Sequence, residues 1–236
     1  MANRSKTINY DPTSFPPFAV TADLVILTVR PPQLEVLLVR RSTAPFAGDW
    51  ALPGGFVGPD QDIDDAARTK LADKTGVTIN KAHLEQLASF GAPDRDPRMR
   101  IVSVAWLALL ANPPEPTTGT EAEEAAWIPV NEIDHSALAF DHATILNAGI
   151  ERAGNRIEYT TLATQFCGAE FTIGELRSVY ETLWGTKLDP ANFHRKVLAS
   201  DGFVTETGKS CSTGRGRPAR TYKRGPAERL NPPLHR

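Results

Sequence analysis

The sequence lacks several features that would each define a class of protein. Its two cysteines, Cys167 and Cys211, are too few for a disulfide framework or a zinc site. The longest apolar stretch, residues 101–111, is much shorter than the roughly 20 residues that span a bilayer. The polar start of the chain, residues 1–10, lacks the apolar segment of a secretory signal. We therefore expect a cytoplasmic protein with reduced thiols and no membrane partner.

An excess of charge is also missing, because the formal net charge is only −2. Taken alone, that value argues against a nucleic-acid partner. The charge is divided unevenly along the chain, however. Residues 1–151 contain 12 Lys and Arg against 20 Asp and Glu, a formal charge of −8, whereas residues 152–236 contain 14 against 8, a formal charge of +6. Such asymmetry is typical of a chain in which one part binds nucleic acid.

The first two thirds of the chain mix strand and helix patterns. After a polar, Pro-rich arm of residues 1–17, we expect strands at 19–29, 34–40, 101–111 and 125–129, a sharply bent segment at 50–57, and helices at 62–75 and 141–153. The turn Arg30-Pro31-Pro32-Gln33 makes the first two strands a hairpin. This order predicts an α+β fold, an α/β/α sandwich, for a domain of residues 18–154.

After Gly154 the pattern changes to short helices, expected at 159–166, 173–184 and 190–199. Thr172 and Glu175 form a capping box at the start of the second of these helices. Asp189 caps the third, with Pro at its first position. Two β-type runs, at 203–207 and 219–223, follow with a Gly/Ser-rich turn between them. Three helices and a hairpin predict a winged helix-turn-helix domain of residues 155–225, followed by a flexible tail of residues 226–236.

The third of these helices has the division that a DNA-recognition helix needs. Phe193, Val197 and Leu198 lie on one side, and Asn192 and Arg195 lie on the opposite side, with Lys196 on the flank. The apolar side can pack on the domain while amide and Arg side chains reach base edges. The hairpin after it is basic and suits contacts to DNA phosphates, through Arg215, Arg217, Arg220, Lys223 and Arg224. A solvated basic tail, or a small helical bundle without DNA, is the competing interpretation.

Residues 55–77 resemble the Nudix box. That signature reads Gly, five residues, Glu, seven residues, Arg-Glu, an aliphatic residue, any residue, Glu-Glu, any residue, Gly and an aliphatic residue. The spacing here is the same, and Gly55, Leu71, Gly76 and Val77 match it. Residues 50–56 also resemble the loop that enters the box. In active members of the family the box carboxylates bind Mg²⁺ or Mn²⁺ for pyrophosphate hydrolysis.

The residues of the box that bind metal in active family members are replaced in this sequence. Gln61 stands at the position of the first Glu, Thr69-Lys70 at that of Arg-Glu, and Asp73-Lys74 at that of Glu-Glu. Hard divalent cations need several oxygen ligands, preferably anionic. Lys70 and Lys74 lie one helical turn apart on the same face as Asp73 and would repel such a cation. We therefore expect no metal site and no enzymatic activity. Four nearby acids precede this register and are expected to cap the helix or to be solvated: Asp60, Asp62, Asp64 and Asp65.

A site that has lost its catalytic residues can still bind its ligand. Arginines suit phosphate oxygens, and glycines let the backbone approach a pyrophosphate. The run Asp94-Arg95-Asp96-Pro97-Arg98 resembles the loop of ADP-ribose-type Nudix proteins, which adds Arg98. Trp50 and Phe56 could contact an adenine, although core packing is the simpler interpretation of both. The candidate ligand-binding residues are Arg40, Arg41, Gly54, Gly55, Phe56 and Arg98.

A Nudix-like domain with an altered box, joined to a winged helix, resembles the NrtR family of Nudix-related transcriptional regulators. Residues 138–142, 171–180 and 216–220 are similar to that family too, so the resemblance covers residues 18–224. It implies a homodimeric bacterial repressor of NAD biosynthesis genes, which binds a double-stranded DNA operator. It also implies ADP-ribose or a related NAD metabolite as effector, with no cofactor required.

Two alternatives remain. One is an active ADP-ribose pyrophosphatase with an accessory C-terminal domain, and the other is the same architecture with another ligand, such as a sugar phosphate.

Overall fold

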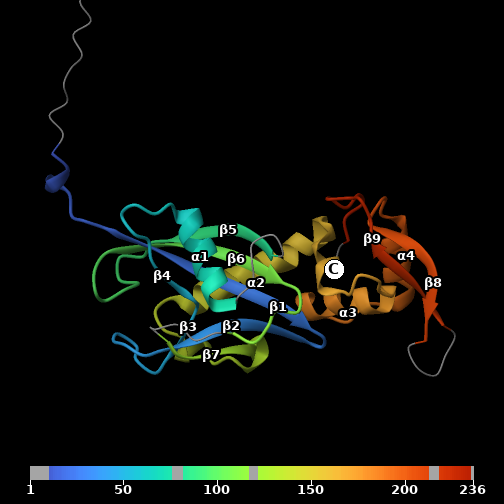
Figure 1. The fold of residues 1–236 in the computed structure, drawn as a ribbon, viewed down its shortest axis with the longest axis horizontal. Coiled ribbons are helices and arrows are strands. Elements are labelled where there is room, and N and C mark those ends of the chain that lie inside the picture. The colour runs from blue at the N-terminus through green and yellow to red at the C-terminus, as the bar shows by residue number, and fades with distance from the viewer. Residues whose placement is uncertain (1–10, 76–81, 117–121, 213–217, 235–236) are drawn as a thin grey trace, which may run out of the picture.

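The computed structural model describes residues 11–75, 82–116, 122–212 and 218–234 (Figure 1). A mixed sheet occupies the N-terminal part, and its strands lie in the order β3-β2-β1-β6-β5, with β4 also paired to β1 and β7 to β2. Only the β1–β6 pair is parallel among the described pairs. The elements are β1 (Ala19–Arg30), β2 (Gln33–Arg41), β3 (Trp50–Ala51), β4 (Gly54–Phe56), α1 (Ile63–Thr75), β5 (Ala82–Phe90), β6 (Ile101–Leu110), β7 (Ala122–Pro129) and α2 (His142–Tyr159).

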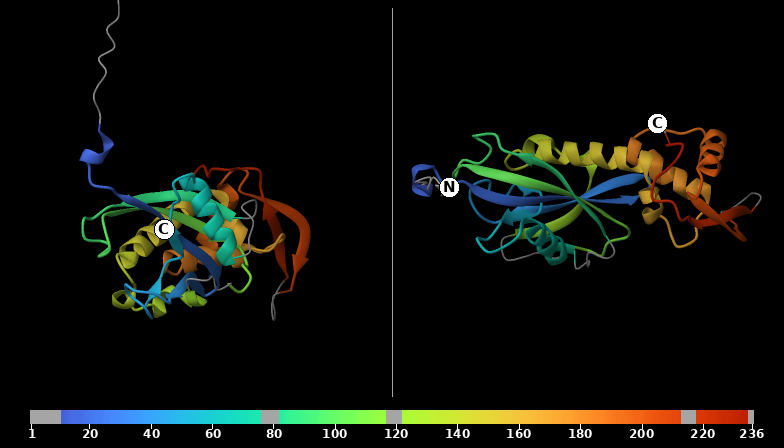
Figure 2. Two further views of the ribbon diagram at one scale, coloured as in Figure 1. Left: turned by 60° about the vertical axis from the view of Figure 1, so that its left-hand side comes forward. Right: turned by 90° about the horizontal axis from the view of Figure 1, so that it is seen from above.

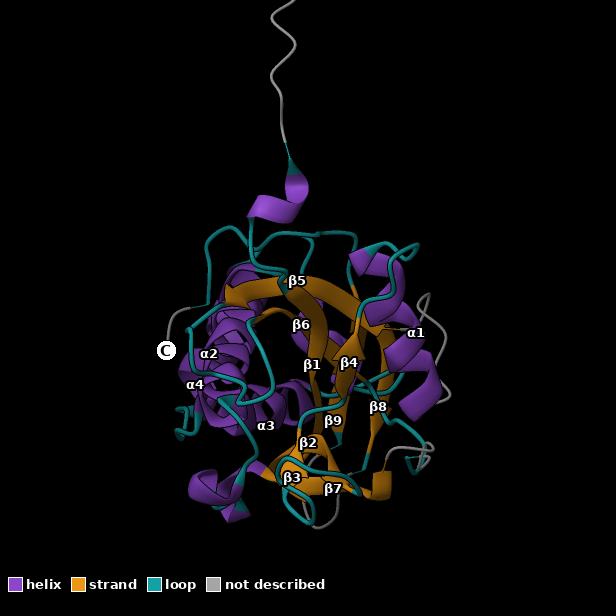
Figure 3. Ribbon diagram, turned by 90° about the vertical axis from the view of Figure 1, so that its left-hand side faces the viewer, coloured by secondary structure: helices purple, strands orange, loops and turns teal. Residues whose placement is uncertain are grey.

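The central strand β1 is buried on both faces of this sheet. Successive side chains of a strand point to opposite faces. Leu24 and Ile26 accordingly pack with Leu71 of α1, whereas Val25 and Leu27 belong to the apolar cluster on the α2 side. Figure 3 shows the sheet between these two helices. The expected α/β/α sandwich is confirmed, and so is the hairpin of β1 and β2.

Helix α2 is longer than expected, because it continues through Gly154 to Tyr159. Gly154 does not end the helix: it is buried, and its carbonyl oxygen accepts a hydrogen bond from Trp184 Nε1 at 3.1 Å. The expected domain boundary at residue 154 therefore falls inside a helix. That helix extends from the sheet to the C-terminal part of the molecule (Figure 2, right).

The C-terminal part consists of the 3₁₀ helix η5 (Thr161–Phe166), α3 (Ile173–Trp184), α4 (Pro190–Ala199), β8 (Val204–Cys211) and β9 (Ala219–Arg224). The capping box of Thr172 and Glu175 is present, and Asp189 accepts a hydrogen bond from Asn192 N. Phe171 and Tyr222 exchange two backbone hydrogen bonds, which add a bridge to the β8–β9 hairpin. This is the expected winged helix, although its first helix is 3₁₀ and begins after Tyr159.

The tail and two strands differ from the expectations. Residues 226–234 are packed, since Leu234 is only 1% exposed and the backbone N–H groups of Leu230 and Leu234 donate to the carbonyl oxygens of Tyr159 and Glu158. The expected flexible tail is thus wrong as far as residue 234. Strand β8 extends to Cys211, past the expected start of the turn, and β5 was not expected because its polar residues hide the strand pattern. None of the described helices is long and apolar enough to cross a membrane.

We predict that Gly149→Ala lowers the free energy of unfolding by about 1–3 kcal/mol, the usual cost of overpacking. Gly149 lies where α2 crosses β1, and a Cβ there would come within 2.6 Å of Val25 Cγ1 and 2.9 Å of its Cβ. Gly174→Ala is the matched control, since a Cβ on this exposed residue of α3 meets only Thr172 Oγ1, at 3.6 Å. Chemical denaturation measures both variants, and equal stability of the two would contradict the prediction.

Candidate functional site

A cavity of about 300 Å³ opens between α1, the sheet and the loop that precedes β6. Most of the described side chains that line it are polar or charged. The lining residues come from β1, β2, β3, β4, β7, α1, the first residue of α2 and the intervening loops. The lining residues are Thr21, Asp23, Val39, Arg41, Thr43, Ala51, Leu52, Gly54, Gly55, Phe56, Lys70, Lys74, Arg95, Asp96, Arg98, Ala122, Phe140 and His142.

Two glycines let β4 approach its neighbours at this cavity. Gly54 pairs with Asp23 of β1, and a Cβ on Gly54 would lie 2.1 Å from Asp23 Oδ1 and 2.8 Å from the carbonyl oxygen of Ala22. A Cβ on Gly55 would lie 3.0 Å from Lys70 Cε. The sequence suggested that both glycines make room for a pyrophosphate. In the structure, Gly54 is required by strand pairing, and Gly55 makes room for a lysine.

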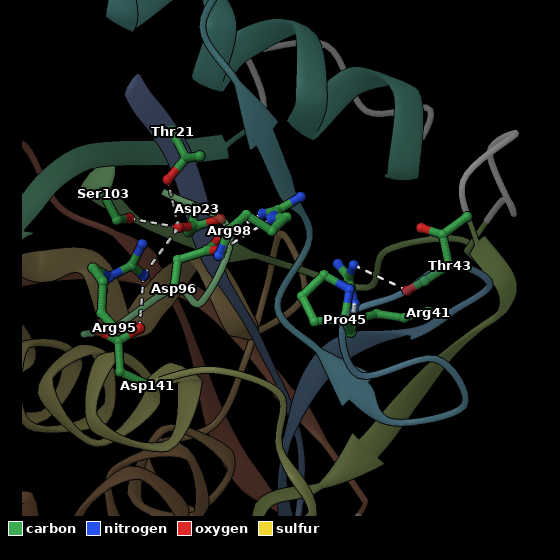
Figure 4. A network of polar contacts seen from close by, with 10 residues as sticks. All are labelled: Thr21, Asp23, Arg41, Thr43, Pro45, Arg95, Asp96, Arg98, Ser103 and Asp141. Carbon is green, nitrogen blue, oxygen red and sulfur yellow. Dashed lines mark hydrogen bonds and ion pairs between the residues drawn. The ribbon is translucent and has the colours of Figure 1, made fainter. Parts of the chain in front are cut away.

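A buried ion-pair network forms one wall of the cavity (Figure 4). Asp23 accepts hydrogen bonds from Thr21 Oγ1 at 3.1 Å and Ser103 Oγ at 2.5 Å, and its Oδ2 lies 3.7 Å from Arg95 Nη2. The same guanidinium donates to both carboxylate oxygens of Asp141, at 2.6 and 2.9 Å. Arg95 thus joins the central strand to the residue that precedes α2. Sequence reasoning missed Asp23, although an acid inside an otherwise apolar strand is itself a signal.

Arg98 is held in the cavity by a second carboxylate. It donates from Nε and Nη2 to Asp96, at 3.0 and 2.7 Å. Burial alone would raise the pKa of the Asp96 carboxyl, but the hydrogen bonds and charge of Arg98 lower it below its ordinary value. The Arg98 guanidinium also lies 5.1 Å from the centre of the Phe56 ring and 5.5 Å from that of Phe140. Two aromatic rings and a guanidinium therefore share one end of the cavity.

His142 adds a neutral polar group at the start of α2. The backbone N–H of Leu52 donates to His142 Nδ1 at 2.9 Å, which leaves the proton of the neutral ring on Nε2. Burial lowers the pKa of His142, because the charged ring would lose its hydration. The ring therefore offers one N–H donor at the cavity wall. The sequence had marked residues 138–142 only by their family resemblance.

Five of the six expected ligand-binding residues line this cavity: Arg41, Gly54, Gly55, Phe56 and Arg98. Arg40 does not. It donates to Glu124 at 3.1 Å and lies 4.7 Å from the centre of the Trp50 ring, because adjacent residues of β2 point to opposite faces. Phe56 is 48% exposed, so the core-packing interpretation of this residue is wrong.

The five altered positions of the Nudix box fall into two groups, those that line the cavity and those that do not. Lys70 and Lys74 line the cavity, whereas Gln61, Thr69 and Asp73 do not. Gln61 Oε1 accepts from Gly58 N at 3.4 Å, and Asp62 caps α1 by accepting from Asp64 N, as expected. Gly76 and Val77 lie outside the described residues. Within the described ranges, no three His, Cys, Asp or Glu residues are grouped so that they could hold a metal ion.

The lining of the cavity is rich in positive charge. It contains Arg41, Lys70, Lys74, Arg95 and Arg98, against the carboxylates of Asp23 and Asp96. One further acid, Asp141, binds Arg95 from outside the lining. Even with that residue counted, the cations outnumber the anions. Such a site suits an anionic ligand with several oxygen acceptors, and its aromatic rings suit a flat apolar group.

The second candidate site is the exposed face of α4. Phe193 and Val197 are buried, and the Phe193 ring centre lies 5.2 Å from that of Tyr180 in α3. Asn192 and Arg195 are exposed and joined by a hydrogen bond of 2.6 Å from Arg195 Nη2 to Asn192 Oδ1. Leu198 is 50% exposed, so its expected place on the packed face is wrong, because the apolar contact of this short helix ends at Val197.

The basic hairpin is described only in part. Arg220 is exposed and donates to Glu206 at 3.0 Å, and Lys223 and Arg224 are exposed on the same strand. Lys196 is half-buried and lines a small groove between α3 and α4. Arg215 and Arg217 lie outside the described residues. An exposed ion pair such as Arg220–Glu206 contributes little, so this arginine can exchange partners readily.

Comparison with known families matches both parts of the chain. Residues 20–148 match the NUDIX domain, and residues 163–223 match the NrtR DNA-binding winged helix domain. Fold and sites thus define a DNA-binding regulator with a Nudix-type domain. The chain is 36% identical to the ADPR responsive transcriptional repressor NtrR of Acinetobacter baylyi over 216 residues, which cover 91% of this chain and 85% of the relative. The protein belongs to the NrtR family of Nudix-related transcriptional regulators.

Solved structures agree with this assignment. The crystal structure of Shewanella oneidensis NrtR complexed with a 27mer DNA matches with a TM-score of 0.73 and 32% identity, over 92% of this chain and 99% of that one. The NUDIX domain of the same protein, complexed with ADP ribose, matches with a TM-score of 0.55 and 35% identity, over 65% of this chain and 99% of that one.

Proposed function

We propose that this regulator is a homodimeric repressor of NAD biosynthesis genes, and that it binds ADP-ribose or a related NAD metabolite in the α1 cavity. One observation carries the proposal: α2 begins at a cation-rich cavity and at its other end binds α3, which packs on the candidate recognition helix α4. The relative in Acinetobacter baylyi is named for its response to ADPR, and a NUDIX domain of the family has been crystallised with ADP ribose.

The chemistry of the cavity fits such a ligand. ADP-ribose has a diphosphate between two ribose groups and an adenine at one end. A guanidinium has five N–H donors, so Arg41 and Arg98 can donate to phosphate oxygens. In the structure, Nε and Nη2 of Arg41 also bind the carbonyl oxygens of Pro45 and Thr43, and those of Arg98 bind Asp96. Phe56 and Phe140 can pack against a base or a ribose. A sugar phosphate, the other ligand considered, would use the cations but has no flat group to pack against the Phe56 ring, which is 48% exposed.

Helix α2 supplies the physical connection between ligand and DNA. His142, its first residue, lines the cavity, and its 18 residues span about 27 Å. Near its other end, the carbonyl oxygens of Gly154 and Ile157 accept hydrogen bonds from Trp184 Nε1 and Tyr180 OH of α3. Tyr180 in turn packs on Phe193 of α4. A ligand that binds more tightly to the arrangement unable to bind DNA would release the repressor.

The two helices α4 of a dimer would enter two major grooves on one side of the DNA. Half-sites would then lie about one helical turn apart, or a multiple of it. Asn192 and Arg195 would contact base edges, with Lys196 beside them. Arg220 and Lys223, together with Arg215 and Arg217, would contact phosphates.

We predict that ADP-ribose weakens binding to DNA from upstream of the protein's own gene. A gel-shift titration with and without ADP-ribose, and with NAD for comparison, measures the effect. Arg98→Gln should need more ADP-ribose for the same release while its DNA affinity without ligand is unchanged. Arg100→Gln is the matched control, because Arg100 does not line the cavity and donates to the carbonyl oxygen of Gly91. DNA binding that is insensitive to both ligands would contradict this effector.

Arg195→Ala should weaken operator binding by about 1–3 kcal/mol and relax the preference at one base position, as expected for loss of a base contact. The matched control is Lys187→Ala, a charge change at an exposed residue between α3 and α4 that already binds Glu181. Fluorescence anisotropy with the operator and single-base variants measures the change. Unchanged operator affinity of Arg195→Ala would remove Arg195 from the interface.

The competing function is ADP-ribose pyrophosphatase. We predict that incubation with ADP-ribose and Mg²⁺ yields no AMP and ribose 5-phosphate at an enzymatic rate, because lysines occupy two positions where hydrolases of this fold have carboxylates. Chromatography of the nucleotides gives the answer directly. Turnover at an enzymatic rate would establish the hydrolase instead.

A further inference from the structure

We propose that Lys70 and Lys74 take the place of the divalent cation in this Nudix site, so that the diphosphate of the effector binds directly to two ammonium groups and binding needs no metal ion. This inference rests on the proposed function, since it assigns the groups that recognise the same ligand. It concerns the chemical basis of recognition, which the likeness to other proteins leaves open.

The residues present do not fit a divalent cation. Of the five box positions, only Lys70 and Lys74 line the cavity, and Asp73, the one remaining acid, does not. A cation at the usual place would therefore meet two ammonium groups and no carboxylate from α1. Hard cations such as Mg²⁺ need anionic or neutral oxygen ligands in near-ideal geometry, so α1 cannot supply this metal site.

The two carboxylates elsewhere in the cavity lining already have partners within the protein. Asp23 accepts from Thr21 and Ser103 and lies beside Arg95. Asp96 accepts from the backbone N–H of Arg98 and twice from its side chain. A metal ion that bound Asp96 would have to compete with Arg98 at both carboxylate oxygens, and one that bound Asp23 would lie close to the buried guanidinium of Arg95. Breaking such a pair leaves an uncompensated charge, which is strongly unfavourable.

The geometry of the lysines suits a diphosphate. They lie four residues apart on one face of α1, and both line the same cavity. Lys70 lies across β4: a Cβ on Gly55 would be 3.1 Å from Lys70 Nζ. Gly55 therefore leaves room for this ammonium group over the loop that enters the box. A Cβ at position 55 would require the end of the Lys70 side chain to shift slightly.

Two ammonium groups supply the same total charge as one Mg²⁺ ion. Each makes charge-assisted hydrogen bonds to phosphate oxygens, as Lys does in many phosphate sites. Unlike Mg²⁺, neither lowers the pKa of a bound water to produce a nucleophile. The exchange therefore keeps the attraction for a diphosphate and removes the means of hydrolysing it. A sensor requires this combination, because it must bind its ligand without consuming it.

Isothermal titration calorimetry of the full chain with ADP-ribose tests the proposal, in buffer with EDTA and in buffer with Mg²⁺. We expect the same Kd in both. Lys70→Gln and Lys74→Gln should each weaken binding about tenfold or more, the usual effect of losing a charge-assisted hydrogen bond. Lys70→Arg should retain most of the affinity. Arg68→Gln is the matched control, since it removes a positive charge from the same helix at a residue that does not line the cavity.

The outcomes separate this proposal from the proposed function. Binding that appears only with Mg²⁺ would overturn the metal-free site and leave ADP-ribose as the effector. Binding of both lysine variants with the affinity of Arg68→Gln, in samples whose thermal unfolding matches the wild type, would also overturn it. Absence of ADP-ribose binding by the wild type in either buffer would instead contradict the proposed function.

Discussion

The rest of the structure depends on one buried guanidinium. Arg95 lies between Asp23 in the central strand and Asp141 at the start of α2, and almost none of its side chain is exposed. Removing Arg95 would leave Asp23 as a buried charge without its cationic partner, which costs more than the intact network contributes. The position of α2 on the sheet is therefore fixed at its first turn by charge. Further along, at Gly149, it is fixed by the close approach to Val25.

From the Arg95 network, helix α2 extends to the DNA-binding elements and determines where they lie. A single apolar cluster runs from Val25 and Leu27 of β1, through Ile157 of α2, to Tyr180 of α3 and Phe193 of α4. The two matched domains, at 20–148 and 163–223, thus share a core instead of being joined by a linker.

Close-packed protein interiors transmit strain and do not deform smoothly. The hydrogen bonds from Tyr180 and Trp184 of α3 to α2, and the packing of Tyr180 on Phe193, give a shift of α2 at the cavity a direct route to α4.

The sequence predicted best what depends on neighbouring residues. The bounds of α3 and α4 agree to the residue, because Thr172 with Glu175 and Asp189 with Pro190 define their starts locally. It failed where a contact with a residue distant in the sequence determines the local structure. Gly154 looks like a helix end, yet Trp184 binds its carbonyl group, and the polar tail is held by Tyr159 and Glu158.

In the cavity, the sequence found Arg98 and both lysines, but it could not choose between Arg40 and Arg41 without the pairing of β2. It also missed Asp23 and His142, whose roles come from partners about 80 and 90 residues away.

The replaced box follows from what a sensor must do. A hydrolase binds its ligand through a metal ion that also activates water, so affinity and turnover depend on the same group. A regulator needs the affinity alone, and it must express a difference in affinity between two arrangements of the chain. The cavity that Lys70 and Lys74 line is also lined by Arg95, which binds Asp141 just before α2, and by His142, the first residue of α2. A ligand in this cavity would therefore contact charges that position α2. Carboxylates and a metal on α1 could also attract a diphosphate, but they would make the bound ligand a substrate.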